Sequence, residues 1–140
     1  LFYSHPTRYH SIHIAIDNRI IAPDGSVVKD FQPELLSQLD VPEEDIKLVQ
    51  DGLHDVTKYG TAASSFRGFT VDIAGKTGTA ENSQGRDHGL FVAYGPFDNP
   101  NVVVAVIVEN GGYGSQSAVP IGRKILEAAF GLNQDGGDKK

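Results

Sequence analysis

Residues 71–81 read Val-Asp-Ile-Ala-Gly-Lys-Thr-Gly-Thr-Ala-Glu, and this stretch decides the fold that we expect for the chain. Val71 and Ile73 are β-favouring residues at alternate positions, and small or hydroxylated residues follow them. This pattern predicts a strand whose second half, the tetrad Lys-Thr-Gly-Thr at 76–79, carries no bulky apolar side chain. The strand therefore has room for something to lie against it.

The tetrad offers a cation and two hydroxyl groups to such a ligand. The two-residue period of a strand places the Lys76 side chain on one face and the hydroxyls of Thr77 and Thr79 together on the other. Gly78 has no side chain, so a ligand can approach the backbone closely there.

Two further strands are predicted downstream, at 89–94 and 101–109, and a turn rich in glycine and proline joins them. With the first strand they would form an antiparallel meander. The nearly continuous apolar run at 102–108 indicates burial on both faces, which predicts a central strand with helices on either side. The expected fold class is therefore α/β (α+β), with antiparallel strands and helices packed in a three-layer sandwich.

A helix is predicted at 42–58, because proline in the first turn and acidic residues at 43–45 suit a helix N-terminus. Its predicted apolar stripe consists of Ile46, Val49, Leu53 and Val56. We expect this stripe to pack in the core, and Gly52 to permit a close crossing with another element.

A second helix is predicted at 117–130, with Pro120 in its first turn and Gly131 just past its end. Its predicted inner face consists of Ile121, Ile125, Ala128 and Ala129. Its predicted outer face carries Arg123, Lys124 and Glu127. We expect the inner face to lie on the sheet.

Two loops flank the 71–81 strand. Residues 60–67 are mostly small and are predicted to form a loop, in which Thr61 is either a ligand-binding residue or a structural spacer. Residues 82–87 are polar and contain a glycine, which predicts a hairpin loop. Arg86 and His88 would either reach a substrate from there or remain solvated.

A β-hairpin is predicted over 18–31 and should end at Phe-Gln-Pro, 31–33, because Pro-Asp-Gly at 23–25 separates two short apolar segments. Ser26 and Lys29 form the one Ser-x-x-Lys sequence in the chain. On a strand these two side chains point to opposite faces, so we reject them as a nucleophile and its base.

The two ends of the chain carry little functional signal. His5, His10 and His13 lie close together, but no cysteine or carboxylate stands at a metal-binding spacing from them, so no metal site is predicted. Residues 133–140 are polar and glycine-rich, which predicts a flexible tail.

Composition limits the function classes. The 140 residues, 39% apolar and 21% charged, suit one soluble domain with a single core. The net charge of −6 and the absence of a basic stripe disfavour nucleic-acid binding. The longest apolar run, 102–108, is too short to span a bilayer. No cofactor is expected.

The tetrad and its neighbours resemble a known family. The tetrad resembles the Lys-Thr-Gly motif of the penicillin-binding proteins and serine β-lactamases. Gly-Thr-Ala at 60–62 precedes it at the spacing seen in class B penicillin-binding proteins, and the segment at 88–96 resembles the family's next strand. The order of motifs over 20–131 resembles the C-terminal part of a penicillin-binding protein 2-like transpeptidase domain. The chain departs from the family at Gly89-Leu90, where Ala-Trp is usual.

The resemblance implies a division into three parts: a poorly matched segment at 1–19, a partial transpeptidase domain with the β-lactamase-like sandwich at 20–132, and a tail at 133–140. It also implies a place in a D,D-transpeptidase that cross-links peptidoglycan by serine acyl transfer. Such enzymes work at the extracytoplasmic face of the bacterial cytoplasmic membrane, with an anchor upstream of this region.

The resemblance also assigns roles to the site residues. The substrate-binding positions would be Thr61, Lys76, Thr77, Gly78 and Thr79. Lys76, Thr77 and Thr79 would hold the terminal carboxylate of a peptidoglycan stem peptide or a β-lactam. Lys76 and Thr79 would also be catalytic, because Lys76 would tune the family's Ser-x-Asn triplet and the backbone N–H of Thr79 would form half of the oxyanion hole.

The family's nucleophile and its proton relay stand in a Ser-x-x-Lys motif and a Ser-x-Asn triplet, both upstream of the matched region. Neither Ser-x-Asn nor Tyr-x-Asn occurs here, so we expect no nucleophile in this chain and no activity from the chain alone. The rest of the transpeptidase domain is therefore an expected partner. A three-stranded remnant of the family's five-stranded sheet would expose apolar surface, which predicts self-association.

The tetrad also allows interpretations other than a transpeptidase motif. A phosphate-binding loop needs glycine where Thr70 stands and a helix after the lysine, neither of which fits. An ordinary edge strand would carry the same tetrad without function. At the level of function, the alternatives are a non-catalytic binding module of this fold and a fragment of a serine β-lactamase.

Overall fold

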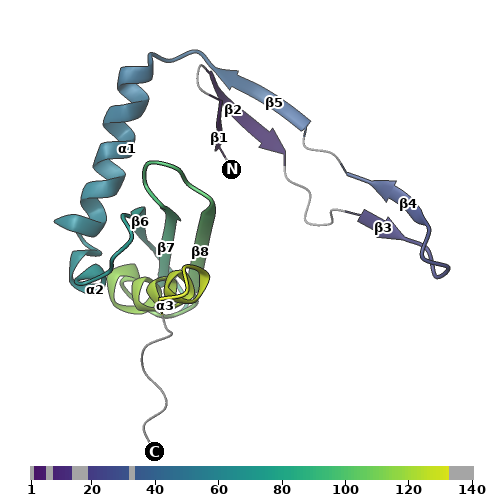
Figure 1. Cartoon of the computed structure of the whole chain (residues 1–140). Coiled ribbons are helices and arrows are strands. Elements are labelled where there is room, and N and C mark those ends of the chain that lie inside the picture. Colours follow the sequence, from purple (N-terminus) through teal and green to yellow (C-terminus); the bar gives the residue numbers. More distant parts are fainter. Residues whose placement is uncertain (1, 6–7, 14–18, 32–33, 133–140) are drawn as a thin grey trace, which may run out of the picture. The chain divides into compact units, whose positions relative to one another are not determined.

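The computed structural model describes residues 2–5, 8–13, 19–31 and 34–132, and Figure 1 labels its elements along the chain. The chain divides into two compact units, with the boundary between Ile46 and Lys47, and each unit is described here by itself. The composition predicts one domain with a single core, whereas the structure has two units.

An antiparallel sheet in the N-terminal unit consists of β1 (Phe2–His5), β2 (Arg8–His13) and β5 (Glu34–Leu39), in the order β1-β2-β5. Sequence reasoning assigned no strand to 34–39, since Glu-Leu-Leu-Ser-Gln-Leu has neither β-branched residues nor polar alternation. Its pairing with β2 decides its conformation, because β-propensity depends strongly on the neighbouring strand.

The backbone places His5 on β1 and both His10 and His13 on β2, while their side chains lie outside the described part of the structure. Where side chains are described, no three His, Cys, Asp or Glu residues gather to hold a metal ion. Residues 32–33 and 133–140, predicted to end the hairpin and to form the tail, also lie outside the described residues.

The predicted hairpin is confirmed: β3 (Arg19–Ile21) pairs antiparallel with β4 (Val27–Asp30). The Ser26 hydroxyl donates a hydrogen bond to the Asp24 carboxylate at 2.6 Å. The Lys29 ammonium lies on β4 and faces the Phe31 ring, 4.6 Å from its centre. Ser26 and Lys29 thus have separate partners, which supports their rejection as a catalytic pair.

A three-stranded antiparallel sheet organises the C-terminal unit, as predicted. Its strands are β6 (Ala74–Ala80), β7 (His88–Gly95) and β8 (Val102–Val108), in the order β6-β7-β8. β6 begins at Ala74, so Val71 and Ile73 precede the strand instead of starting it, and Ile73 is buried in the core.

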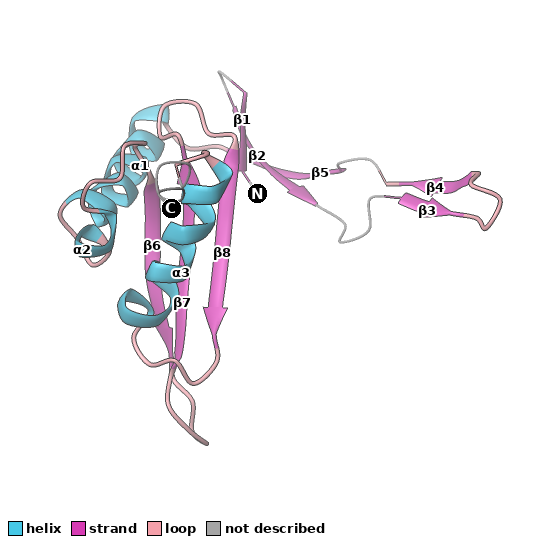
Figure 2. Cartoon of the chain, turned by 60° about the horizontal axis from the view of Figure 1, so that its bottom comes forward, coloured by secondary structure: helices cyan, strands magenta, loops and turns pink. Residues whose placement is uncertain are grey.

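The core lies between this sheet and α3 (Gly114–Ala129), which crosses one face of all three strands (Figure 2). Its buried members include Phe91, Val104, Val106, Ala118, Val119 and Leu126. The predicted combination of antiparallel strands and packed helices is confirmed.

The prediction that the apolar run 102–108 is buried on both faces is wrong for this unit. β8 is an edge strand of the sheet, and burial alternates along it. Val104 and Val106 face the core and are 6% and 8% exposed, whereas Val103 and Ile107 are 54% and 69% exposed. Since the sequence of the strand is apolar at every position, only the packing of α3 against one face distinguishes the two sets.

The predicted inner face of the last helix is also wrong. Ile121 and Ile125 are 44% and 45% exposed, and Ala128 and Ala129 are exposed as well. The buried positions of α3 are instead Gly114, Ala118, Val119, Gly122 and Leu126. The helix also starts at Gly114, three residues before the predicted start, so Pro120 lies inside it and not in its first turn.

Small residues explain why this face was missed. A Cβ added at Gly122 would stand 2.5 Å from Cδ1 of Phe91, so α3 approaches the sheet along its smallest residues and turns its isoleucines away. The predicted helix end is confirmed: Gly131 follows α3 with φ +69°, and its N–H donates to the Ala128 carbonyl.

The predicted helix at 42–58 is confirmed as α1 (Glu43–Lys58), but its stripe packs less than expected. Val49 is 60% exposed, whereas Val56 packs against the core of the C-terminal unit and Thr57 is buried. Apart from the backbone of α1 itself, no atom of the described residues lies within 4 Å of a Cβ added at Gly52, so the predicted close crossing is wrong.

The predicted loop at 60–67 contains a short helix, α2 (Ala63–Phe66). Ala62 and Phe66 are buried in the core, and the Phe66 ring lies 5.9 Å from the Phe91 ring. Ala62 and Phe66 therefore serve packing, which the prediction of a loop misses.

Candidate functional site

The tetrad lies on β6, an edge strand that pairs with β7 alone among the described strands. Lys76 and Thr79 are exposed, and Thr77 and Gly78 are partly buried. The other edge of β6 has no strand partner in the described part of the chain, so its backbone N–H and C=O groups are available to an added strand.

The register of the sheet shows which face each tetrad residue belongs to. Lys76 pairs with Val92, which is half exposed, whereas Thr77 pairs with Phe91, which is fully buried beneath α3. Directly paired residues of antiparallel strands share a face. Lys76 and Thr77 therefore lie on opposite faces, as the two-residue period predicted.

The Lys76 ammonium is folded back on its own strand. Its Nζ donates a hydrogen bond to the carbonyl of Thr77 at 2.9 Å. Within the described residues it forms no ion pair. An exposed cation without a carboxylate partner can bind an anionic group at little structural cost.

The Thr77 side chain meets a residue from the segment before β6. Its Oγ1 lies 2.7 Å from Oγ1 of Thr61, so one hydroxyl donates to the other. The backbone around Thr61 is held by bonds from the Ala62 N–H to the Val56 carbonyl and from the Ala63 N–H to the Gly60 carbonyl, both 3.1 Å. The structure thus brings Thr61 and the tetrad together.

The end of α1 fixes the segment that leads into β6. The Thr57 hydroxyl donates to the Ile73 carbonyl, and the Lys58 ammonium bonds to the Asp72 carboxylate. His54 stacks on Phe97 with ring centres 4.3 Å apart. Sequence reasoning missed these contacts between the end of α1 and the segment before β6, although the polar residues at 54, 57 and 58 share one face of the predicted helix.

The charge on Asp72 is stabilised by this contact. The hydrogen bond from Lys58 is the main cause that lowers the pKa of Asp72 below its ordinary value, and the nearby His54 acts in the same direction. His54 Nε2 lies 3.9 Å from the carboxylate, and this buried atom has no hydrogen-bond partner among the residues that the structure describes.

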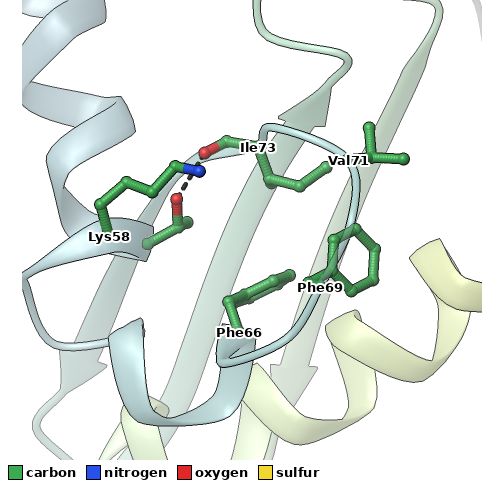
Figure 3. A pocket seen from close by; sticks show the side chains of 6 residues that line it. Lys58, Phe66, Phe69, Val71 and Ile73 are labelled. Carbon is green, nitrogen blue, oxygen red and sulfur yellow. Dashed lines mark hydrogen bonds between the residues drawn. The ribbon is translucent and has the colours of Figure 1, made fainter.

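A small pocket opens beside this contact (Figure 3). It is lined by Thr57, Lys58, Phe66, Phe69, Val71 and Ile73, and the dashed line in the figure is the bond from Thr57 to the Ile73 carbonyl. Its volume of about 20 Å³ holds a single water molecule. The pocket is therefore too small for a peptide, and the exposed edge of β6 is the better candidate.

The C-terminal end of the tetrad lies close to the start of α3. A Cβ added at Gly114 would stand 2.3 Å from the carbonyl oxygens of Gly78 and Leu90. A Cβ at Gly89 would stand 2.0 Å from Oγ of Ser117. These glycines bring the first turn of the helix directly onto the strand pair beside the tetrad.

The predicted loop between β6 and β7 is confirmed, and it is tied to the loop after β8. Asn82 Nδ2 donates to Oδ1 of Asn110 at 2.8 Å, and the Gly112 N–H donates to the Asp87 carbonyl. The Asn110 N–H donates to Nδ1 of His88 at 2.9 Å. His88 therefore has a structural partner, and the proton of its neutral ring is assigned to Nε2.

Arg86 lies in the same loop and is exposed. Its Nη2 would stand 2.8 Å from a Cβ at Gly112, so the guanidinium lies against the loop after β8. Both residues were predicted either to reach a substrate or to remain solvated. The exposed position of Arg86 is compatible with either role, whereas His88 is partly buried and bonds to Asn110.

The groups gathered at this site suit the binding of a ligand. The tetrad and Thr61 supply one ammonium, several hydroxyls and an open strand edge. Such an arrangement suits the capture of an extended peptide with a terminal carboxylate by strand addition. Ser26, the serine of the Ser-x-x-Lys sequence, belongs to the other unit and bonds to Asp24.

The sequence matches a family model described as the penicillin binding protein transpeptidase domain, over residues 11–127. It is 33% identical to the peptidoglycan D,D-transpeptidase MrdA of Haemophilus influenzae, with 81% of this chain and 20% of that protein covered. It is also 33% identical to penicillin-binding protein 2A of Bacillus subtilis, with 77% and 17% covered. The chain therefore spans about one fifth of the length of these relatives.

Solved structures show the same likeness. Penicillin-binding protein A from M. tuberculosis, in an acyl-enzyme complex, superposes with a TM-score of 0.70 at 27% identity, covering 86% of this chain and 28% of the other. Pseudomonas aeruginosa PBP2, in complex with WCK 5153, gives a TM-score of 0.66 at 34% identity, covering 83% and 26%. The fold predicted for the chain is confirmed by these likenesses.

Proposed function

Because this chain belongs to the penicillin-binding protein transpeptidase domain family, we propose that it supplies the substrate-binding edge of a D,D-transpeptidase that cross-links peptidoglycan by serine acyl transfer. The single observation that carries this proposal is the arrangement on β6. An unpaired strand edge carries the exposed Lys76 ammonium, and the Thr77 hydroxyl lies 2.7 Å from that of Thr61.

The backbone and the side chains of the tetrad strand then bind different parts of the peptide. The peptide lies antiparallel along β6 and bonds to its backbone, while Lys76, Thr77 and Thr79 hold the terminal carboxylate. Lys76 leaves its bond to the Thr77 carbonyl and turns to the substrate, which exchanges one hydrogen bond for a charge-assisted pair. Gly78 has no side chain, so the peptide can approach the backbone of β6 closely there.

The Thr79 N–H supplies one of the two donors of the oxyanion hole. An oxyanion hole speeds acyl transfer only where a nucleophile creates the oxyanion, and the other donor belongs to the nucleophilic serine. The serine, its lysine and the Ser-x-Asn triplet come from the remainder of the transpeptidase domain, which is thus the first partner of this chain. The substrate partners are a peptidoglycan stem peptide and β-lactam antibiotics.

This chemistry takes place at the extracytoplasmic face of the cytoplasmic membrane, where the peptidoglycan substrate is found. Among the residues that the structure describes, no helix is both long and apolar enough to cross a bilayer.

The test uses the complete protein that contains this chain. We expect a fluorescent penicillin to label it covalently, and Lys76→Ala to lower the second-order labelling rate by about 10- to 100-fold, the effect of removing one charged hydrogen-bond donor. Lys124→Ala, which removes an exposed lysine of α3, is the matched control and should label like the wild type.

Each other outcome points to a different function. A complete protein that carries Ser-x-x-Lys and is not labelled would favour a non-catalytic binding module of this fold. Rapid hydrolysis of a chromogenic cephalosporin would favour a serine β-lactamase. Labelling that is unaffected by Lys76→Ala would remove the tetrad from the proposed site.

A further inference from the structure

Arg123 makes contacts that its predicted place on the outer face of α3 does not explain. Its Nη1 donates to the backbone carbonyls of Ser65 and Arg67, the latter at 3.2 Å. Its Nε donates to Oε1 of Glu127 at 2.6 Å. The Arg123 side chain is 30% exposed, and its guanidinium lies over the Phe69 ring. Arg123 is therefore a partly buried link between α3 and the end of α2.

The two carbonyls need an external donor because α2 is so short. The helix has four residues and ends where Arg67 takes an extended conformation, with φ −58° and ψ 125°. The last carbonyls of any helix have no partner within it. A guanidinium holds several donors in a fixed plane, so one arginine can satisfy two such carbonyls.

The other end of α2 leads to the tetrad. The N–H groups of Ser65 and Phe66 donate to the Ala62 carbonyl at 3.0 and 3.2 Å, and Ala62 is fully buried. Thr61 directly precedes Ala62, and its hydroxyl lies 2.7 Å from that of Thr77. A continuous set of hydrogen bonds and covalent bonds thus runs from Arg123 to Thr77.

We infer that Arg123 is a positioning residue for the tetrad: by holding the C-terminal end of α2, it fixes Thr61 where its hydroxyl orients that of Thr77. Arg123 itself touches no tetrad residue and acts through α2. The meaning of this for substrate binding rests on the proposed function, in which Thr77 binds the substrate carboxylate. The orientation of Thr77 can be measured without any substrate.

Packing of Phe66 is the competing explanation for the position of Thr61. Phe66 is buried, and its ring lies 5.2 Å from the Phe69 ring and 5.9 Å from the Phe91 ring. If this packing alone fixes α2, removal of the guanidinium leaves Thr61 in place. The two explanations therefore differ in what Arg123→Ala does to Thr61 and Thr77.

The test is NMR of the 140-residue chain without ligand. In Arg123→Ala, we expect the amide protons of Ser65 and Phe66 to exchange about tenfold faster or more, as for a lost hydrogen bond to a charged group. The side-chain signals of Thr61 and Thr77 should shift in the same variant, while the amide exchange of β7 stays near that of the wild type. Unchanged Thr61 and Thr77 signals would overturn the inference.

Two further variants separate positioning from a general loss of stability. Leu126→Ala empties a fully buried site one turn along α3 and should speed exchange throughout the unit, without a selective shift at Thr61 and Thr77. Glu127→Gln removes the charge partner and leaves the carbonyl bonds, so it should resemble the wild type.

Arg123→Lys tests the positioning role if Arg123→Ala does not fold. Lysine keeps one donor group, so this variant should give an intermediate shift of the Thr61 and Thr77 signals. A wild-type spectrum for Arg123→Lys, or the full shift in Glu127→Gln, would overturn the inference. Penicillin labelling of the complete protein remains a separate measurement, so failure of one proposal is distinguishable from failure of the other.

Discussion

Gly122 of α3 faces the ring of Phe91 of β7 so closely that a Cβ at Gly122 would stand 2.5 Å from Cδ1 and 2.8 Å from Cε1 of that ring. Phe91 is fully buried and pairs with Thr77 of the tetrad strand. The distance of α3 from the sheet is therefore set at a residue that neighbours Thr77 on the same face of the sheet.

We expect Gly122→Ala to destabilise the chain by about 1 to 3 kcal/mol, because the ring must move to admit the methyl group. Gly52→Ala is the control: Gly52 lies inside α1 with no atom within 4 Å of the new Cβ, so the change should stabilise by about 0.5 to 1 kcal/mol. Urea unfolding measures both. A neutral Gly122→Ala would show that the helix moves away from the sheet at little cost.

A second close approach joins Gly89 and Ser117. An added Cβ at Gly89 would meet Oγ of Ser117 at 2.0 Å and the Gly112 carbonyl oxygen at 3.0 Å. We expect Gly89→Ala to cost about 1 to 3 kcal/mol of the free energy of unfolding. Ser117→Ala removes the hydroxyl, so the double variant should recover part of this loss, as a double-mutant cycle would measure. Strictly additive effects would contradict the contact.

The pair of Asp72 and Lys58 predicts a pH dependence. The bond from Lys58 lowers the pKa of Asp72 in the folded chain below the ordinary 3.8, so acid protonates the unfolded state first. The stabilisation is complete above the unfolded pKa and is lost as the pH falls through the folded pKa.

Asp72→Asn should therefore be less stable than the wild type at neutral pH, by at most about 1 kcal/mol because the carboxylate is half exposed. This difference should disappear in acid well below the ordinary carboxyl pKa. Urea unfolding at both pH values measures it, and Lys58→Met should reproduce the behaviour. A difference that is the same at both pH values would rule out the ion pair as its cause.

The face of the sheet opposite α3 predicts self-association. Val92, Val103 and Ile107 are 50%, 54% and 69% exposed there. We expect the isolated chain to associate in light scattering, and Ile107→Lys to shift it toward the monomer, since a charge on an exposed edge strand opposes pairing. Leu48→Lys, at an exposed apolar position of α1, should have little effect. A monodisperse wild-type monomer would refute the prediction.

Incubation of the isolated chain with a fluorescent penicillin should leave no label that survives denaturation. On the proposed function, the chain supplies the carboxylate site, and the serine that opens the lactam ring belongs to the remainder of the transpeptidase domain. Labelling is read on a denaturing gel, with the complete protein as the positive control. Stoichiometric labelling of the chain alone would mean that another of its hydroxyls is the nucleophile.

Much of the secondary structure follows from local sequence. Alternation and turn residues predicted β3, β4 and the three strands of the C-terminal sheet, and the acidic first turn predicted α1. β5 was missed because its residues have no strand preference of their own and its pairing with β2 decides. α2 was missed because small residues suit both a loop and a closely packed turn of helix.

The site divides in the same way. The tetrad and its neighbour Thr61 were recognisable from residue types and spacing, and the two-residue period assigned Lys76 and Thr77 to opposite faces. The contacts that hold these residues were not recognisable: they join Thr61 to Thr77, Thr57 to Ile73, and Arg123 to Ser65. Each joins segments far apart in sequence, so no local pattern records it.

The sequence by itself determined β3, β4, the three strands of the C-terminal sheet, α1 and the family, because these depend on neighbouring residues and on side-chain identity. Tertiary structure alone decided which face of each element is buried. Every position from 102 to 108 is apolar and α3 carries apolar residues on more than one side, so periodicity could not choose. The choice depends on where small residues, such as Gly114 and Gly122, let the helix come closest to the sheet.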